Sequence, residues 1–327
     1  MVQNAKFFGK IPMTLIRSFV GAVLLFSTLQ ACYPQNQPAP GPPSGPPGQT
    51  WAQQQKSQSF AAEKLAKSPR RREWVNIPLG SRNLGAWVIY PETAKKAGLV
   101  LVLHEAFGLT DSTINTADEV ASMGYIAIVP DLLSGYGPNG GGTSSFATTR
   151  DGGNALDMLE DEDVYPDLNA WVDYGNKLTQ ANGKFAIVGL TWGGGVAFRY
   201  AISAPRPELK AVFVFCVSGP PEYNQGPAHF HKGIHDWPVI KTSVPVYGFY
   251  GGKDLTGPPD SAVLYSIPST RRWMAAVGNF YDPVIYENAE HAFMRIGEDP
   301  KNDNPANAAA AKASLIRLEK LLNEYLN

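Results

Sequence analysis

Short apolar runs rich in β-branched and aromatic residues alternate with segments of helical pattern from Glu73 to the C-terminus. We expect strands at Trp74–Ile77, Leu84–Tyr90, Leu99–Leu103, Tyr125–Val129, Phe185–Val188, Ala211–Phe215, Val244–Tyr250 and Tyr281–Tyr286. We expect helices at Asp111–Met123, Asp167–Leu178, Gly193–Ser203, Asp260–Val277 and Asn307–Leu326. The strands are mostly apolar throughout, as in a parallel sheet that is covered on both faces. The alternation predicts one α/β domain over residues 73–327, with a doubly wound, mostly parallel sheet and an antiparallel hairpin at its start.

The N-terminal region has the pattern of an export signal. Basic residues up to Arg17 precede the apolar run Ser18–Leu29, which is short for a membrane-spanning helix but suits a signal peptide. The run ends in Leu-Gln-Ala-Cys, which resembles a bacterial lipobox, so we expect residues 1–31 to be removed and Cys32 to be lipidated. Gln30 is unusual at its position, which leaves open secretion without a lipid, and a retained membrane helix is the third alternative.

Residues 32–72 are expected to connect this anchor to the folded domain. The stretch from Tyr33 to about Gln58 is dominated by Pro, Gln and Gly, a composition that cannot bury a core, so we expect a semi-extended tether. The protein would then be periplasmic or on the cell surface, attached to a bacterial membrane through its lipid alone. An acylated Cys32 leaves Cys216 without a disulfide partner, and its apolar strand setting predicts an inert, buried thiol.

The charge balance excludes one class of partner. The chain of 327 residues has 28 Lys and Arg against 29 Asp and Glu. Near-neutrality argues against nucleic acid or an acidic membrane surface as the main partner. Two long stretches, Ser134–Tyr165 and Ser218–Thr242, are rich in Gly, Pro and aromatic residues. Irregular segments of that length usually serve as covers over functional sites. The sequence predicts no particular oligomeric state.

A Gly-rich turn follows the expected strand Phe185–Val188 and precedes a helix. Its sequence, Gly-Leu-Thr-Trp-Gly-Gly-Gly, has the G-x-nucleophile-x-G spacing of a nucleophile elbow, with Thr191 at the raised position. Glycine allows the sharp turn and the close approach of helix and strand. The helix N-terminus and the amide of Trp192 can stabilise an oxyanion there. The pattern is only moderately specific on its own, since Gly-rich turns are common.

A carboxylate and an imidazole follow the next strands in the order that such a site needs. Asp254 comes after Val244–Tyr250, and His291 comes just after Tyr281–Tyr286. The order nucleophile, acid, histidine is that of α/β-hydrolases, and the carboxyl ends of parallel strands meet at one edge of the sheet. His291 would act as the general base, oriented by Asp254. Each residue alone could be a loop cap or a surface group, so the prediction depends on their conjunction.

A further motif ends the strand Leu99–Leu103. There His-Glu-Ala-Phe-Gly occupies positions 104–108, where a backbone amide usually supplies the second oxyanion donor. Together the motifs resemble the dienelactone hydrolase family over about Trp74–Asn327. His-Glu-Ala-Phe-Gly is similar to its Q/H-E-I-F-G, the elbow to G-x-C-x-G-G, and Glu-His-Ala-Phe-Met-Arg at 290–295 to G-H-x-F-x-R. This resemblance implies an α/β-hydrolase fold, a small-molecule ester or lactone as substrate, and no cofactor.

The resemblance also implies a set of site positions. The nucleophile position falls on Thr191, the acid on Asp254 and the base on His291. The Glu that gates nucleophile activation falls on Glu105. The oxyanion donors fall on the amides of Ala106 and Trp192. The Arg that holds a substrate carboxylate falls on Arg295, and a second is expected within 134–165, where Arg150 is the only candidate. A solvated helix end is the alternative for Arg295.

Position 191 departs from the family, which has Cys there. A thiol ionises near neutral pH once its pKa is lowered, whereas a hydroxyl needs concerted proton removal by the base. A β-branched residue is also uncomfortable on a strained turn, at a cost on the order of 1–3 kcal/mol. Three interpretations remain open: a slow esterase that uses Thr191, a catalytically impaired binding or scaffolding lipoprotein, and a variant disabled by substitution.

A rival site is present in the second long stretch. His229, His231 and His235 have H-x-H-x3-H spacing and are followed by Asp236, so they could hold a metal ion. Zinc sites, however, are usually built on rigid elements with supporting partners, and none is visible in this segment. We therefore expect a cover loop and no metal. No phosphate-binding or dinucleotide motif follows a strand, so no cofactor is expected.

Overall fold

The computed structural model describes residues 49–219, 240–256 and 262–327. All of them belong to one unit, Pro47–Asn327. The expected signal peptide, Cys32 and the histidines at 229, 231 and 235 lie outside the described residues, as does Asp236. None of the described helices has both the length and the apolar character that crossing a membrane would require.

An eight-stranded sheet forms the centre of this unit, in the order β1-β2-β4-β3-β5-β6-β7-β8. The strands are β1 Arg72–Leu79, β2 Arg82–Ile89, β3 Ala97–Leu103, β4 Ile126–Pro130, β5 Ala181–Leu190, β6 Leu209–Phe215, β7 Val246–Gly251 and β8 Tyr281–Tyr286. β2 pairs antiparallel with β1 and with β4, and the six strands from β4 to β8 are parallel. The expected hairpin is present, since Leu79 pairs with Arg82 across a turn in which Gly80 has a φ of 60°.

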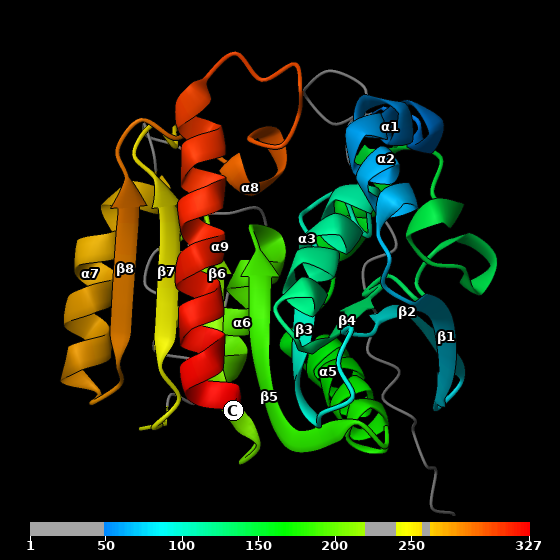
Figure 1. Cartoon of the computed structure of the whole chain (residues 1–327), viewed down its shortest axis with the longest axis horizontal. Coiled ribbons are helices and arrows are strands. Elements are labelled where there is room, and N and C mark those ends of the chain that lie inside the picture. The colour runs from blue at the N-terminus through cyan, green and yellow to red at the C-terminus, as the bar shows by residue number, and fades with distance from the viewer. Residues whose placement is uncertain (1–48, 220–239, 257–261) are drawn as a thin grey trace, which may run out of the picture. The chain divides into compact units, whose positions relative to one another are not determined.

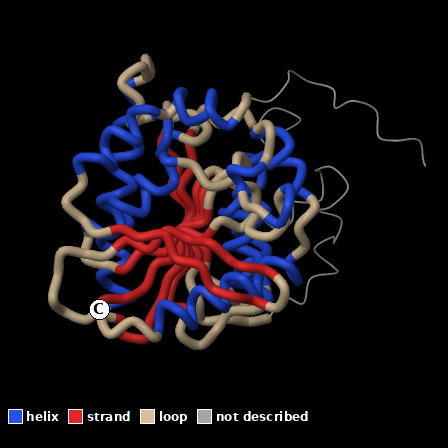
Figure 2. The backbone as a smooth tube through the Cα atoms, turned by 90° about the vertical axis from the view of Figure 1, so that its right-hand side faces the viewer, coloured by secondary structure: helices blue, strands red, loops and turns tan. Residues whose placement is uncertain are grey.

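Helices cover both faces of the sheet (Figures 1 and 2). The α-helices are α1 Trp51–Ser57, α2 Ser59–Lys67, α3 Asp111–Ser122, α4 Thr149–Asp157, α5 Asp161–Asn176, α6 Trp192–Ser203, α7 Ala262–Ala276, α8 Phe293–Ile296 and α9 Pro305–Leu326, and two short 3₁₀ turns are η1 Pro138–Gly140 and η2 Thr143–Ser145. One core contains α5, α6 and α7. The other contains α3, α8, α9 and Leu65 of α2. The α/β prediction is therefore confirmed.

The central strands are apolar on both sides because each side faces helices. In β3, Leu99, Leu101 and Leu103 belong to the core under α5 and α6, whereas Val100 and Val102 belong to the core under α3 and α9. All five are at most 1% exposed. Alternate side chains of a strand point to opposite faces, so a buried parallel strand has to be apolar at every position.

Two segments expected to be irregular contain helices. Trp51–Lys67, which was assigned to the extended tether, forms α1 and α2, since Ala61 and Leu65 find an apolar partner surface that composition cannot reveal. Residues 134–165 contain η1, η2, α4 and the beginning of α5. α5 starts six residues earlier than expected because a capping box at Glu160 and Asp163 begins it, and Pro166 then removes only one backbone hydrogen bond.

Candidate active site

Thr191 lies on a sharp turn between β5 and α6. Its backbone has φ 45° and ψ −105°, a region that β-branched residues rarely adopt. The amide of Thr191 donates to the carbonyl of Phe215 at 2.9 Å, and the amide of Gly193 donates to the carbonyl of His104 at 3.1 Å. These bonds fix the turn from the neighbouring strands on both sides. The backbone at Thr191 is therefore held in the strained geometry of a nucleophile elbow.

The glycines of this turn are required by close packing. A Cβ atom on Gly189 would lie 2.4 Å from the carbonyl oxygen of Gly193. A Cβ atom on Gly193 would lie 2.7 Å from the carbonyl oxygen of His104. Any side chain at either position would displace backbone, so the helix can start directly above the strand only with glycine there.

Asp254 and His291 come together at the ends of β7 and β8. Nδ1 of His291 lies 2.8 Å from Oδ2 of Asp254, and the other carboxylate oxygen accepts a hydrogen bond from the Thr256 amide at 3.0 Å. Asp254 is fully buried, while the His291 side chain is 31% exposed. The carboxylate favours the tautomer with its proton on Nδ1, which leaves Nε2 able to accept a proton. No hydrogen bond joins the Thr191 hydroxyl to His291 among the described residues.

Two glycines allow this approach of β7 to the loop that carries His291. A Cβ atom on Gly251 would lie 2.5 Å from the carbonyl oxygen of Glu290, and one on Gly252 would lie 2.2 Å from that of Glu287. The loop is also held by the amide of Lys253, which donates to the carbonyl of Ala289 at 2.8 Å. The carboxylate is thus positioned under the imidazole by backbone packing.

Glu105 and Arg295 form an ion pair next to this edge of the sheet. Nε of Arg295 lies 3.1 Å and 3.3 Å from the two carboxylate oxygens of Glu105. Glu105 is buried, at 6% exposure, and the Arg295 guanidinium lies 5.8 Å from the centre of the Phe107 ring. Only Nε of the guanidinium contacts Glu105, so the two terminal nitrogens, which donate to no other described residue, can bind an incoming anion.

The His104 side chain connects the loop of residues 104–108 to the segment after β4. It is fully buried, and burial lowers its pKa, so the ring is neutral. Nδ1 lies 2.9 Å from the carbonyl oxygen of Glu105, and Nε2 accepts the amide of Leu132 at 3.3 Å. The ring also stacks on Trp192, with centroids 6.1 Å apart. Sequence reasoning assigned no role to His104, although its position directly before Glu105 was the available signal.

The two expected oxyanion donors come from two segments, Trp192 directly after the turn at Thr191 and Ala106 in the loop after β3. Trp192 is the first residue of α6, so its amide has no partner within the helix. Ala106 is exposed, and its amide donates no hydrogen bond to another described residue. Arg150 lies in the first turn of α4, and this helix packs on the loop, since a Cβ atom on Gly153 would lie 3.2 Å from the carbonyl oxygen of Ala106.

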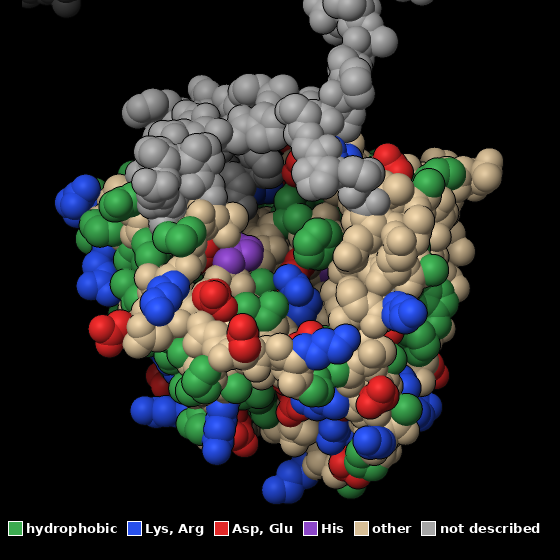
Figure 3. All heavy atoms as spheres, turned by 90° about the horizontal axis from the view of Figure 1, so that it is seen from above, with side chains coloured by type: hydrophobic (Ala, Val, Ile, Leu, Met, Phe, Trp, Pro, Cys, Tyr) green, Lys and Arg blue, Asp and Glu red, His purple; other side chains and the backbone are tan. Residues whose placement is uncertain are grey.

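Seen from the carboxyl ends of the strands, this edge of the surface is hollowed, with histidine, acidic and basic side chains around the hollow (Figure 3). The structure thus brings Asp254 to His291 and Glu105 to Arg295 at the edge where Thr191 lies.

Cys216 lies beside the acid and the base, directly after β6. It is 3% exposed and has a φ of 50°, and its amide donates to the carbonyl of Phe249 at 3.0 Å. Burial, together with the charge of Asp254, raises the pKa of the thiol to about 12. The thiol is therefore protonated and unreactive at neutral pH. Sequence reasoning expected a buried thiol but missed its place next to the site, which depends on the adjacency of β6 and β7.

One group of described side chains could hold a metal ion. The sulfur of Cys216 and donor atoms of Asp254 and His291 all lie within 4.8 Å of one another.

The comparisons with known proteins agree with this architecture. The chain is 27% identical over 223 residues to a "Putative carboxymethylenebutenolidase" of Yersinia pestis, covering 67% of this chain and 77% of that one. It is 30% identical over 130 residues to carboxymethylenebutenolidase 1 of Cupriavidus pinatubonensis, covering 38% and 55%. Among solved structures, the "Putative Dienelactone Hydrolase" of Klebsiella pneumoniae has a TM-score of 0.59 at 23% identity, covering 76% and 97%.

The model of the dienelactone hydrolase family matches residues 84–326, a span that begins in β2 and ends with the last residue of α9. It includes the elbow, the His291–Asp254 pair and the Glu105–Arg295 pair. The chain therefore belongs to the dienelactone hydrolase family of hydrolases.

Proposed function

We propose that the protein hydrolyses a carboxylic ester or lactone with Thr191 as nucleophile, His291 as general base and Asp254 as the group that orients the base. The observation that carries the proposal is the 2.8 Å contact between His291 and Asp254, at the sheet edge where Thr191 stands on its strained turn. The buried carboxylate also stabilises the imidazolium that forms when the base takes a proton.

The reaction would proceed in two steps. The Thr191 oxygen attacks the carbonyl carbon while Nε2 of His291 takes the hydroxyl proton, and the amides of Ala106 and Trp192 stabilise the oxyanion. His291 then gives this proton to the departing alkoxide, which leaves an acyl group on Thr191. Water, activated by the same base, releases the acid and restores the hydroxyl. No cofactor takes part in either step.

The Glu105–Arg295 pair supports a substrate that carries a carboxylate. A substrate carboxylate can accept hydrogen bonds from the two terminal nitrogens of the guanidinium while Nε keeps its contact with Glu105. Glu105, which then shares the guanidinium with the substrate, is proposed to gate nucleophile activation, as the family resemblance implies. Arg150 on α4 is proposed as the second anion-binding group.

Turnover of two p-nitrophenyl esters tests this proposal, with a neutral butyrate and a glutarate monoester that carries a carboxylate. We expect slow hydrolysis by the parent, and a loss of at least about 100-fold in His291→Ala, as is typical of general-base removal. Lys301→Ala, an exposed position on the same C-terminal part of the chain, should retain parent activity. Equal rates for parent and His291→Ala would refute the triad.

A non-catalytic binding lipoprotein is the second candidate, and one observation favours it. Position 191 holds Thr, and its hydroxyl makes no hydrogen bond to His291 within the described part of the chain. This candidate predicts saturable binding of the glutarate monoester by calorimetry, weakened by Arg295→Gln, without release of p-nitrophenol. For either function we propose that the protein is exported and lipid-anchored through Cys32.

A further inference from the structure

The segment Gln49–Lys67, which we call the N-terminal arm, contains α1 and α2 and precedes the part of the chain matched by the family. Figure 1 shows α1, α2 and α8 at the same end of the unit, the end toward which β7 and β8 point. The arm therefore lies at the end of the unit where the carboxyl ends of the strands carry the candidate active site, and it lies outside the family match.

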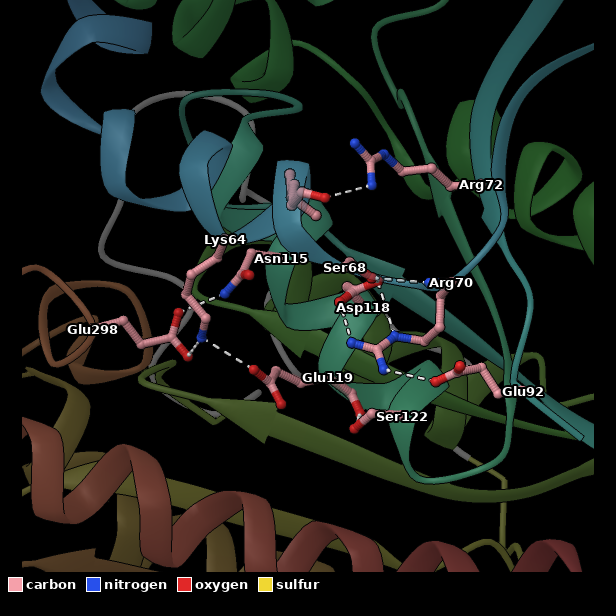
Figure 4. Close-up of polar contacts among 11 residues, drawn as sticks. Lys64, Ser68, Arg70, Arg72, Glu92, Asn115, Asp118, Glu119, Ser122 and Glu298 are labelled. Atoms are coloured by element: carbon pink, nitrogen blue, oxygen red, sulfur yellow. Dashed lines mark hydrogen bonds and ion pairs between the residues drawn. The ribbon is translucent and has the colours of Figure 1, made fainter.

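Lys64 of α2 forms two ion pairs with residues outside the arm. Its ammonium lies 3.1 Å from Glu298, just beyond α8, and 3.0 Å from Glu119 in α3 (Figure 4). Glu298 also accepts a hydrogen bond from the Asn115 side chain. Burial raises the pKa of Glu298, and the Lys64 charge opposes that rise. For Lys64, burial lowers the pKa, but the two carboxylates together raise it above its ordinary value. Lys64 thus stabilises the ionised form of a largely buried carboxylate.

Glu298 is connected directly to Arg295. Its amide donates to the carbonyl of Arg295 at 3.3 Å, closing the turn at the end of α8. α8 has only four residues, so its own hydrogen bonds cannot hold it rigidly in place. The Arg295 guanidinium on this short helix faces Glu105. The Lys64–Glu298 contact therefore holds the end of α8, while the buried side chains of Phe293 and Met294 hold its start.

The arm also contacts α3 and α4. The Gln58 side chain accepts the amide of Ser112 at 3.3 Å, in the first turn of α3, which lacks a side-chain cap of its own. The amide of Thr149, the residue before Arg150, donates to the carbonyl of Gln49 at 2.8 Å. The arm thus contacts α4, which carries Arg150, the residue Glu298 beyond α8, and α3, the helix that follows the loop with Glu105.

We propose that the N-terminal arm positions the carboxylate-binding side of the active site, with Lys64 as the positioning residue for Arg295. Lys64 touches no substrate; it sets the orientation of the guanidinium through Glu298. The selectivity for carboxylate-bearing esters then depends on an element outside the family match. The expected change in ester selectivity rests on the proposed function. The contact of Lys64 with the α8 turn can be tested whether or not the protein hydrolyses an ester.

The kinetic test compares Lys64→Met with Lys67→Met, which removes the same charge from the same helix at a residue that forms no ion pair with another described residue. We expect Lys64→Met to raise the KM for the glutarate monoester about fivefold, the upper end of the effect expected for the ion pairs of a largely exposed lysine. KM for the neutral butyrate should stay within about twofold of the parent, and Lys64→Arg should restore selectivity. A merely structural role would change both esters alike, and that result would overturn the proposal.

Amide hydrogen exchange provides the second readout, and it requires no activity. The five amides from Arg295 to Asp299 donate to backbone carbonyls, so their exchange reports how firmly the α8 turn is held. Lys64→Met should accelerate exchange in this segment, and Lys67→Met should not. Unchanged exchange in Lys64→Met would overturn the proposal whether or not the esters turn over. If no ester is hydrolysed but exchange accelerates, the proposed function fails and the positioning role of the arm stands.

Discussion

Replacing Thr191 with Cys tests the nucleophile assignment most directly. The groups that a thiolate would use lie at the same edge of the sheet: the His291–Asp254 pair, the N-terminus of α6 and the two amides proposed for the oxyanion. The substitution also removes the branched methyl group from a residue held at φ 45°. That backbone conformation costs on the order of 1–3 kcal/mol for a residue other than Gly. A β-branched side chain is more crowded against the backbone there than an unbranched one.

The size of the effect follows from the proton that has to be removed. At pH 8 a thiol with an ordinary pKa of about 8.5 is roughly one quarter ionised. The Thr hydroxyl is not ionised at that pH, so its attack relies wholly on proton transfer to His291. General-base assistance is typically worth about 10²–10⁴-fold, and a thiolate avoids part of this requirement. We therefore expect kcat/KM of Thr191→Cys to exceed the parent by about 100-fold, or about 2.7 kcal/mol of barrier.

The assay measures kcat/KM on p-nitrophenyl butyrate for the parent and for Thr191→Cys, Thr191→Ser and Thr191→Ala. Thr191→Ser relieves the crowding but keeps the harder proton transfer, so it should lie between the parent and Thr191→Cys. Thr191→Ala should have no activity that depends on the triad. In Thr191→Cys, adding His291→Ala should remove the gain. If Thr191→Cys is no faster than Thr191→Ala, position 191 is not a nucleophile site and the binding function takes precedence.

Other predictions concern the supports of the site, the thiol, the anchor and the metal. Gly108→Ala should lower the free energy of unfolding in urea by about 2–3 kcal/mol, because its φ is +81° and the new Cβ would lie 2.5 Å from Cγ2 of Thr143. The control Gly80→Ala, at φ +60° with open space around the new Cβ, should lower it by only about 1 kcal/mol. Cys216 has a pKa raised to about 12, so it stays neutral below that pH, and iodoacetamide at pH 8 should modify it only after denaturation, as read by mass spectrometry. Intact mass of membrane-extracted protein should show a chain that starts at Cys32 plus acyl groups; an unmodified product with another N-terminus would contradict the anchor. Elemental analysis should find no stoichiometric zinc, whereas zinc that is lost in a His231 variant would favour the rival metal site.

The fold could be predicted from the sequence because its signals are local. The expected strand Tyr281–Tyr286 matches β8 at both ends, and Leu99–Leu103 lies within β3. Apolar runs separated by helical patterns determine the order of elements, and the order of strands then places Thr191, Asp254 and His291 at one edge. The contact between His291 and Asp254 follows from that order and from the glycines that end β7.

The N-terminal arm could not be predicted, because its helices are marginal without their partners. α1 is seven residues long and α2 nine, both too short to be stable alone. α2 is stabilised by burial of Ala61 and Leu65 and by the reach of Lys64 to Glu119 and Glu298. The Lys64–Glu298 pair joins residues 234 positions apart, a relation that no local pattern contains. The same argument applies to Cys216, whose place beside Asp254 depends on strand order.

The strain at Thr191 is imposed by the neighbouring backbone rather than by the side chain itself. The amides of Thr191 and Gly193 donate to carbonyls of β6 and of the loop after β3, and neither bond involves the side chain of residue 191. The elbow would therefore persist with any residue that tolerates φ 45°. For this reason the elbow geometry alone does not distinguish a catalytic Thr from a retained scaffold. The Glu105–Arg295 and His291–Asp254 pairs are more informative: each places a buried carboxylate against a partly exposed base or guanidinium at this edge, a costly arrangement that a packing role would not require.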